Sequence, residues 1–550
     1  MTGILLDLVE PRKFLEDRKI AFVFWDGARP YCHLGKLSYR ALRKKTENFA
    51  GALSEIGVKP GDRLAVILPN MLQFPVVYFG ALMAGAVVVP INPLYARTPE
   101  EIAKILNDSG AESIVALDLF LPALEKIEKN VRLNNIIVTT VADSLPALKK
   151  AAYYAKSFWK DLRGKENYFY YPSGKNQKIR SYAQMIYEGG QPRNIKIRPQ
   201  DLALILYTSG TTGDPKGVMH THESLLANAY ACKKLILELG LKEGKETFLA
   251  AAPYFHIMGI AAMLNTALLV RAKIVLIPKP SEFKTMLEAI RYTRATGFVG
   301  TPGFFKGLAG ELKKDEKKEQ ASSLKLCISG ASKIDSNIKQ EFESLWGRKI
   351  LIGYGLSETG VTHCQRSGSE FDSVGFPLDG VEEKFADTDE NFTGELCVRS
   401  KSNTIGYWRK PEKTREVLCS ESWFITGDLA KRDMKSGTVI LGRAESDFVK
   451  GKGGEKISLS VVEDVLMKHS QVVDAAAVGN FSENKRGYEI KAFVVLRDPK
   501  TSCEKYLLEE LKQLCKDNLS LAELPDKIKC VSLIPRNHLG KVLKKELKAL

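Results

Sequence analysis

Short apolar runs alternate with helix-like segments along most of this chain. Ser38 is a suitable N-cap, and Leu42, Phe49 and Leu53 recur at helical spacing after it. Gly57 ends that segment, and "RLAVILP" follows, a continuous apolar run typical of a strand buried on both faces. The alternation returns in "TPEEIAKILNDSG" with "ESIVAL", in "LALILYTSG", and in "KLCISGASKIDSNIKQEFESLWGRKILIGYG". This order predicts the α/β class, with parallel-type sheets covered by helices.

The length of the chain predicts more than one domain. A single hydrophobic core stops growing well below 550 residues. After Arg443 the pattern changes to a helix (460–468), two strands ("VVDAAAVG", "EIKAFVVL"), a helix ("KYLLEELKQLCKDNL") and a strand ("KIKCVSLI"). We therefore expect a large N-terminal domain over 1–443 and a small C-terminal α+β domain over 444–550.

No segment has the length and apolarity of a membrane span. The longest apolar run, 74–91, is interrupted by Pro and Gly and predicts a buried helix followed by a buried strand. The N-terminal residues lack the basic and apolar regions of a signal peptide, and the nine Cys residues form no C-x-x-C pair. We expect a cytoplasmic protein. The basic, aromatic-rich segment 149–180 either packs on the main body or contacts anionic lipid as a peripheral membrane patch.

The charge of the chain favours anionic partners. Lys and Arg number 81 against 65 Asp and Glu, a net charge of +16. Nucleotides, phosphorylated cofactors, nucleic acid and anionic membranes all fit that excess. No nucleic-acid recognition motif accompanies it, so we expect small-molecule partners and no nucleic acid.

The stretch "LYTSGTTGDPKGVMHTH" predicts a phosphate site. A strand runs into the glycine loop at Thr208, and a helix is expected from about Thr221, an arrangement that aims backbone N–H groups at an anion. Hydroxyls can donate to phosphate oxygens, and Lys216 adds a mobile positive charge. It is not a Walker loop, because Pro215 and Gly217 flank the lysine and no hydroxyl follows it. A Gly-Thr turn without function is the alternative.

Five motifs occur in one order: "YTSGTTGDPKG", "GYGLSETG" (353–360), "TGD" (426–428), "GR" (442–443) and "PRNHLGK" (535–541). In that order and spacing they resemble the AMP-forming adenylate-forming superfamily, which includes acyl-CoA synthetases, luciferases and adenylation domains of peptide synthetases. The resemblance covers nearly the whole chain. It implies that a carboxylate attacks the α-phosphorus of ATP to give an acyl-adenylate and pyrophosphate, and that coenzyme A then displaces AMP. It further implies Mg²⁺ as a cofactor.

The same resemblance assigns roles to individual residues. Lys541 would be the main electrostatic catalyst and Glu358 the magnesium ligand, with Thr208 and His256 also in the catalytic set. Tyr354 would lie against adenine. The implied nucleotide contacts are Thr208, Ser209, Gly210, Thr211, Thr212, Gly213, Lys216, Gly330, Ala331, Tyr354, Gly355, Ser357, Asp428, Arg443 and Lys541. Asp428 and Arg443 would contact the ribose hydroxyls; otherwise Asp428 is a turn residue.

In the family, the small domain is mobile and rotates about a hinge after adenylation. Family members commonly read G-R-x-D-D-x-I-K at this hinge, whereas this chain reads "GRAESDFVK", with one residue more. Either Glu445 or Asp447 would be the pivot.

The stretch "PYFHIMG" is expected to line the acid-binding pocket with His256, Met258 and Gly259. No Asp takes a position suited to an α-amino group, so an apolar tail is favoured over an amino acid. The insertion between "LPALKKAAYYAKSFWK" and the glycine loop resembles one in bacterial-type long-chain fatty acyl-CoA synthetases, and this resemblance implies a medium- or long-chain fatty acid. The alternatives are an aryl-CoA ligase for cinnamate- or benzoate-like acids, a fatty acyl-AMP ligase that serves a carrier protein, and a non-catalytic nucleotide or lipid sensor. We expect a monomer or a homodimer.

Overall fold

The computed structural model describes residues 3–10, 18–25, 33–145, 150, 178–208, 215–315, 323–366, 373–386, 388, 393–444, 448–450, 456–482, 487–497, 504–521, 523–536 and 542–549. The chain forms two compact units. The larger comprises 1–368, 377–382 and 399–424, and the smaller comprises 369–376, 383–398 and 425–550. The domain boundary at 443/444 stays a prediction.

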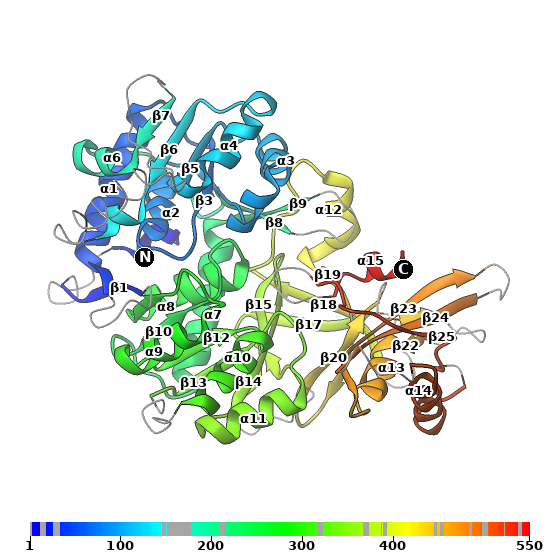
Figure 1. The fold of residues 1–550 in the computed structure, drawn as a ribbon. Helices are drawn as coiled ribbons and strands as arrows, with labels where there is room; N and C mark the ends of the chain where they lie inside the picture. Colours follow the sequence, from blue (N-terminus) through cyan, green and yellow to red (C-terminus); the bar gives the residue numbers. More distant parts are fainter. Residues whose placement is uncertain are drawn as a thin grey trace, which may run out of the picture. The chain divides into compact units, whose positions relative to one another are not determined.

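The larger unit contains two sheets (Figure 1). In the first, all neighbouring strands are parallel except the last pair, β8 and β9. Its order is β7 (Ile179–Ser181), β6 (Asn135–Thr139), β5 (Ser113–Leu117), β3 (Arg63–Ile67), β4 (Val87–Pro90), β8 (Leu202–Thr208) and β9 (Lys216–Thr221).

The second sheet has a parallel centre and antiparallel edges, at β14 with β15 and at β1 with β2. Its strands follow in the order β15 (Gly360–Cys364), β14 (Ile350–Leu356), β13 (Leu326–Ser329), β12 (Gly297–Gly300), β10 (Thr247–Ala250), β11 (Lys273–Leu276), β1 (Ile20–Trp25) and β2 (His33–Ser38). The two-residue strand β16 (Phe376–Pro377) falls where the chain passes between the units.

Helices cover both faces of each sheet, which explains the continuous apolar runs. Leu64 and Val66 belong to a core shared by the two sheets, whereas Ala65 and Ile67 belong to a separate core on the opposite face. The shared core also contains α1 (Tyr39–Glu55), α2 (Gln73–Met83), α7 (His222–Glu238) and a π-helix, Met258–Asn265, that continues into α8 (Thr266–Leu269).

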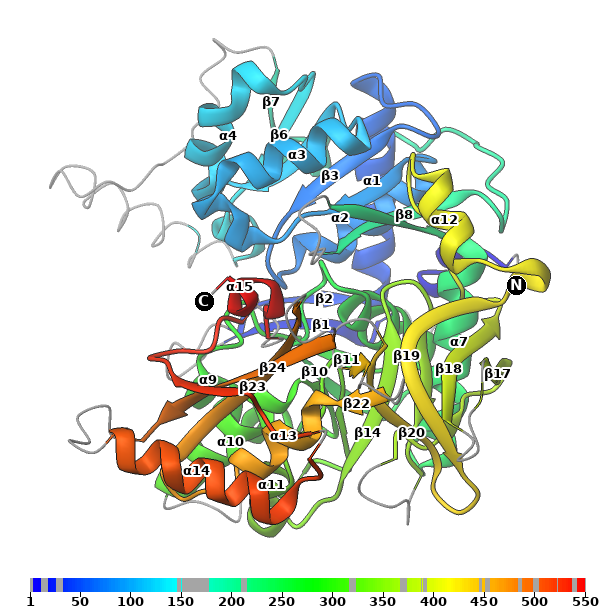
Figure 2. The ribbon, with the colours of Figure 1, turned by 90° about the vertical axis from the view of Figure 1, so that its right-hand side faces the viewer.

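The outer faces carry the other helices. The first sheet is covered by α3 (Pro99–Ser109) and α4 (Leu121–Ile127), which Figure 2 shows lying across it. The outer core of the second sheet contains α9 (Phe283–Thr293), α10 (Pro302–Lys314) and α11 (Ser336–Trp346). The larger unit also contains two short helices, α6 (Tyr182–Glu188) and α12 (Pro411–Val417).

Several expectations from the sequence are confirmed. Ser38 caps α1, because its side chain accepts a hydrogen bond from the Ala41 amide at 3.1 Å. The run 74–91 forms α2 and β4 as predicted. None of the helices in the described ranges is long and apolar enough to cross a membrane. The segment 149–180, apart from residues 150 and 178–180, lies outside the described residues.

The smaller unit has the predicted α+β order of helix, strand, strand, helix, strand. These elements are α13 (Leu459–Leu466), β23 (Val472–Ser482), β24 (Gly487–Leu496), α14 (Glu504–Asn518) and β25 (Lys527–Cys530). They share one apolar core. A four-stranded sheet, mostly in this unit, has the order β17 (Val381–Ala386), β18 (Thr393–Ser400), β19 (Phe424–Asp433) and β20 (Gly437–Arg443). The remaining elements are β21 (Phe448–Lys450), β22 (Lys456–Ser458) and α15 (Lys544–Lys548).

Candidate active site

The glycine loop joins two antiparallel strands. Thr208, the last residue of β8, pairs with Lys216, the first residue of β9, and α7 begins only after β9, with Thr221 as its N-cap. The helix expected from about Thr221 is confirmed, but the sequence did not predict strand β9 between the loop and that helix. The intervening residues 216–221 complete the edge of the first sheet by hydrogen bonding to β8. Residues 209–213, the predicted phosphate contacts, lie outside the described part of the chain.

Glu358 lies in the turn between β14 and β15. Its Oε1 accepts a hydrogen bond from the Tyr407 hydroxyl at 2.9 Å. Its backbone carbonyl accepts from the Thr404 amide at 2.6 Å. The Ser402 hydroxyl donates to the neighbouring Thr359 carbonyl at 2.8 Å. The segment that contains Ser402, Thr404 and Tyr407 thus holds the turn and its carboxylate.

His220 of β9 holds the same turn from another side. Its Nε2 lies 2.8 Å from the Ser357 carbonyl oxygen, which can only accept, so Nε2 carries the proton. Burial lowers the pKa of this imidazole to about 4, because the charged form would be desolvated. At neutral pH His220 is therefore an uncharged donor that fixes the backbone next to Glu358.

Sequence reasoning missed the segment 404–409. Ile405 and Trp408 donate backbone hydrogen bonds to Met219 and Gly217 of β9 at 3.2 and 2.7 Å. Tyr407 is 6% exposed, and the Lys216 ammonium lies 5.5 Å from its ring centroid. The only local signal was a pair of large aromatic residues directly after Gly406.

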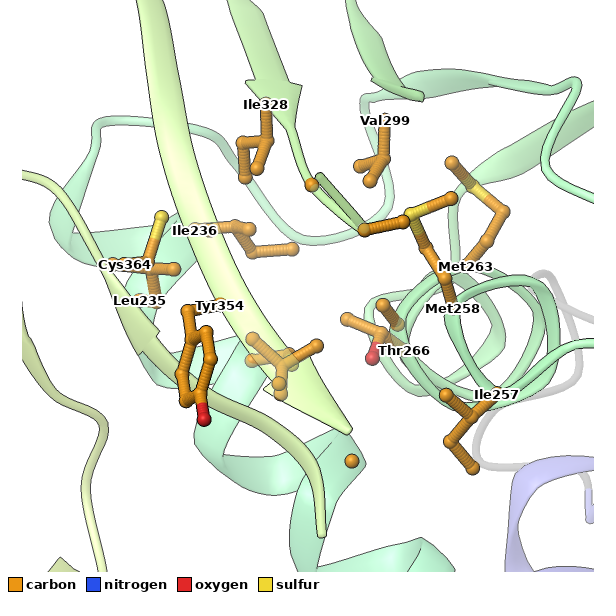
Figure 3. A pocket seen from close by; sticks show the side chains of 18 of the residues that line it. Leu235, Ile236, Ile257, Met258, Met263, Thr266, Val299, Ile328, Tyr354 and Cys364 are labelled. Atoms are coloured by element: carbon orange, nitrogen blue, oxygen red, sulfur yellow. The ribbon is translucent and has the colours of Figure 1, made fainter. Parts of the chain in front are cut away.

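An apolar pocket opens beside β14 (Figure 3). It holds about 830 Å³ of empty space, including space open to solvent. Its walls come from α7, through Leu235 and Ile236, and from the π-helix, through Met258 and Met263. No Asp, Glu, Lys or Arg is among the described residues that line it. Six of the site residues predicted from the sequence line this pocket: His256, Met258, Gly330, Ala331, Tyr354 and Gly355.

The pocket therefore joins residues predicted for the nucleotide and for the acid. Gly259 is not among the lining residues: it is buried, and a Cβ there would lie 2.0 Å from the Pro253 carbonyl oxygen. Glycine is thus needed for close packing of the π-helix against the preceding loop. His256 is half-buried, and its Nδ1 accepts from the Met258 amide at 3.3 Å.

Asn70, which follows β3, fixes the loop that leads to His256. Its Nδ2 donates to the carbonyls of Ala250 and Ala252 at 3.0 and 2.9 Å, and its Oδ1 accepts from the Tyr254 amide at 3.0 Å. Asn70 is 4% exposed. A side chain from the connection after β3 of the first sheet thereby sets the backbone at and after the end of β10 in the second.

In the smaller unit, Asp428 and Arg443, the two predicted ribose contacts, form an ion pair. They face each other across β19 and β20, and Arg443 Nε lies 2.9 Å from Asp428 Oδ1. Arg443 Nη1 also donates to the Thr426 carbonyl at 2.7 Å. Asp428 is 4% exposed, so its charge is buried and paired.

Other predicted residues lie outside the described ranges: Lys541 and the hinge candidates Glu445 and Asp447. Within the described ranges, no group of three or more His, Cys, Asp or Glu side chains could hold a metal ion. Magnesium in nucleotide enzymes usually takes one or two carboxylates, with phosphate oxygens and water completing its shell. Glu358, a carboxylate in a half-buried turn, fits that requirement.

Comparison with protein families gives two matches. The family described as "AMP-binding enzyme" matches residues 16–408, and "AMP-binding enzyme C-terminal domain" matches residues 461–541. The chain belongs to the AMP-binding enzyme family. The resemblance drawn from the five motifs is thereby confirmed.

Curated relatives of this AMP-binding enzyme are named acid–CoA ligases, in agreement with the predicted enzyme class. It is 32% identical to a long-chain-fatty-acid–CoA ligase of Bacillus subtilis (strain 168), over 93% of this chain and 90% of that protein. Identity to the long-chain-fatty-acid–CoA ligase of Escherichia coli O157:H7 is 31%, over 93% and 90%.

Solved structures similar to this AMP-binding enzyme confirm the predicted fold class. ATP-bound MatB from Rhodopseudomonas palustris has 25% identity and a TM-score of 0.79, covering 100% of this chain and 99% of that one. A benzoate CoA ligase from Burkholderia xenovorans LB400 has 23% identity and a TM-score of 0.77, with coverage of 100% and 99%.

Proposed function

We propose that this AMP-binding enzyme converts a medium- or long-chain fatty acid to its acyl-CoA, with ATP and coenzyme A as co-substrates. In the first step a carboxylate oxygen forms a bond to the α-phosphorus, and the bond to the β-phosphate oxygen breaks, releasing pyrophosphate. In the second step the thiol sulfur bonds to the acyl carbon and AMP leaves. The bond between the acyl carbon and the AMP phosphate oxygen breaks in that step, and the thiol proton passes to solvent.

A pocket whose described lining contains no Asp, Glu, Lys or Arg is the observation that carries this proposal. Nucleotide-binding candidates such as Tyr354 and Gly355 line it together with aliphatic side chains of α7 and the π-helix. A dicarboxylate or an amino acid would place a second charge against walls without a described counter-charge, and burying such a charge is costly. An acyl chain instead gains about 0.8 kcal/mol for each CH₂ group removed from water.

This gain predicts a preference by chain length. Four further CH₂ groups inside the pocket would add about 3 kcal/mol, or roughly 200-fold in affinity, until the chain reaches the end of the pocket. Cys232 and Cys364 also line the pocket, and burial raises the pKa of both thiols to about 12. They remain uncharged at neutral pH and serve as apolar wall residues.

The charged residues of the site would act on the phosphates. Lys216 and Lys541 would bring positive charge to the α-phosphate region, and Glu358 would hold a magnesium ion, which neutralises phosphate charge when bound. Asp428, whose Oδ1 is paired with Arg443, would accept hydrogen bonds from the ribose. The reacting carboxylate is itself the nucleophile, so no activated serine or cysteine is required.

An aryl acid is the second candidate, because Phe248, His256 and Tyr354 bring three rings to the pocket wall. A flat acid could stack on them, and the expected signature is a preference for benzoate or cinnamate over every alkyl acid.

Pyrophosphate release distinguishes these functions. ATP, magnesium and one acid would be supplied, with acids from four to sixteen carbons plus benzoate and cinnamate, each with and without coenzyme A. Release that rises with alkyl chain length, with thioester formed only when coenzyme A is present, supports the proposal. Lys541→Ala should abolish release, whereas Lys548→Ala, an exposed lysine of α15, should not. Adenylate without thioester would indicate an acyl-AMP ligase, and ATP binding without release would indicate a sensor.

A further inference from the structure

Tyr407 lies between two side chains of opposite charge. Its hydroxyl donates to Glu358 Oε1 at 2.9 Å, and the Lys216 ammonium lies 5.5 Å from the centroid of its ring. The side chain is buried. One phenol thus contacts the carboxylate through its polar edge and the ammonium through its face.

The backbone of Tyr407 is fixed independently of Glu358. Its amide donates to Thr414 Oγ1 at 2.9 Å, at the start of α12. Tyr407 also forms a β-bridge with Val218 of β9, next to the hydrogen bond from Trp408 to Gly217. The position of the phenol is therefore set by β9 and α12.

The backbone of Glu358 is fixed as well, by the Thr404 amide. What stays adjustable is rotation of its side chain. A carboxylate accepts hydrogen bonds in several directions, and a donor held at one oxygen selects one rotation. Because the donor is rigid, the carboxylate keeps this orientation before any ligand arrives, which is the requirement for a preorganised site.

We propose that Tyr407 is a positioning residue, which orients the Glu358 carboxylate through its hydroxyl and holds the Lys216 ammonium beside it through its ring. The inference rests on the proposed function, in which both groups act on ATP. Losing the hydroxyl should reduce magnesium-dependent ATP affinity by about tenfold or more, because hydrogen bonds to charged groups are the stronger class.

Tyr407→Phe removes the hydroxyl and keeps the ring. Tyr39→Phe is a matched control: Tyr39 is 2% exposed, its hydroxyl donates to the Ala272 carbonyl at 3.0 Å, and the Arg271 guanidinium lies 4.8 Å from its ring centroid. ATP affinity would be measured by calorimetry in magnesium and in EDTA, together with melting temperature. Pyrophosphate release would be measured in parallel.

We expect Tyr407→Phe to lower the ATP affinity measured in magnesium and to leave the ATP affinity measured in EDTA unchanged. In a Glu358→Ala background the same substitution should have no further effect, since the hydroxyl acts through that carboxylate. Tyr407→Leu also removes the ring and should lower ATP affinity further than Tyr407→Phe does. This further loss of affinity should vanish in a Lys216→Met background.

Unchanged affinity in Tyr407→Phe, an undiminished loss in the Glu358→Ala background, or an equal loss in Tyr39→Phe would each overturn the inference. The calorimetric arm needs only ATP and magnesium. If the wild type binds ATP and magnesium but releases no pyrophosphate with any acid, the proposed function is wrong. The calorimetric comparison would still test the role of Tyr407 in that case.

Discussion

Replacing Asn70 should loosen one wall of the pocket without touching a ligand. In Asn70→Ala the Tyr254 amide and the Ala252 carbonyl lose the partners described above, whereas the Ala250 carbonyl still accepts from Ile277 at 3.3 Å. A buried polar group without a partner costs about 1–3 kcal/mol. Two such groups predict a loss of roughly 2–6 kcal/mol, concentrated in the loop 250–256.

Amide hydrogen exchange is the appropriate assay, because a chain with two compact units need not unfold in one step. The peptide that contains Tyr254 should exchange at least about 30-fold faster in Asn70→Ala, as expected for a loss of about 2 kcal/mol or more. Since the loop leads to His256, KM for the acid should rise more than kcat falls.

Two further variants sharpen the test. Asn70→Asp keeps an acceptor for Tyr254 but places a carboxylate against two carbonyls, so it should destabilise the loop at least as much as alanine. Asn135→Ala removes a different buried amide, which donates to Ser113 Oγ at 3.1 Å on β5, and should leave the loop unchanged. Exchange in Asn70→Ala equal to that of the wild type would refute the reasoning.

Three other outcomes are expected. Burial lowers the pKa of His220 and of His222 to about 4 from an ordinary 6.5, so the free energy of unfolding should fall as the pH drops from about 6.5 to 4. Denaturant titrations at stepped pH check this, and the dependence of the unfolding free energy on pH should be weaker in His222→Gln. Gly360→Ala should lower the melting temperature more than Gly347→Ala, because both have positive φ but only at Gly360 would a Cβ meet the Asn228 side chain, at 2.6 Å. Ala262 lines the pocket, and a phenylalanine there would occupy space needed by a long acyl chain. Ala262→Phe should therefore reduce activity on long-chain acids more than on short-chain acids, measured with both acids competing in one assay.

The fold was largely predictable because its signals are local. The Ser38 cap, the apolar run of β3 and the buried pair α2 and β4 each follow from a dozen or so neighbouring residues. Strand β9 was missed for the same reason. Its six residues include Gly217 directly after a glycine-rich loop, a pattern that indicates a turn and not a strand. Its assignment as a strand depends on its pairing with β8, which the local sequence does not contain.

The candidate site was predictable only in part. Motifs named Tyr354, His256 and Glu358 as candidates, but they did not indicate the residues that hold these side chains in place. Asn70 contacts a loop 180 to 184 positions away, and Tyr407 reaches Glu358 across 49 positions. Such pairings depend on tertiary contacts, which no window of sequence contains.

The π-helix Met258–Asn265 makes the specificity of this pocket adjustable by a change in chain length. A π-helix has about one more residue per turn than an α-helix, so deleting one residue within it would restore α-helical winding. The tighter α-helical winding, about 100° per residue, would offset most of the lost residue, so the residues on both sides of the deletion would keep nearly the same directions. Met258 and Thr266 both line the pocket and lie on opposite sides of such a deletion. One lost codon, without any substitution, would thus close the wide π turn and reshape this wall of the pocket while Met258 and Thr266 still face the substrate.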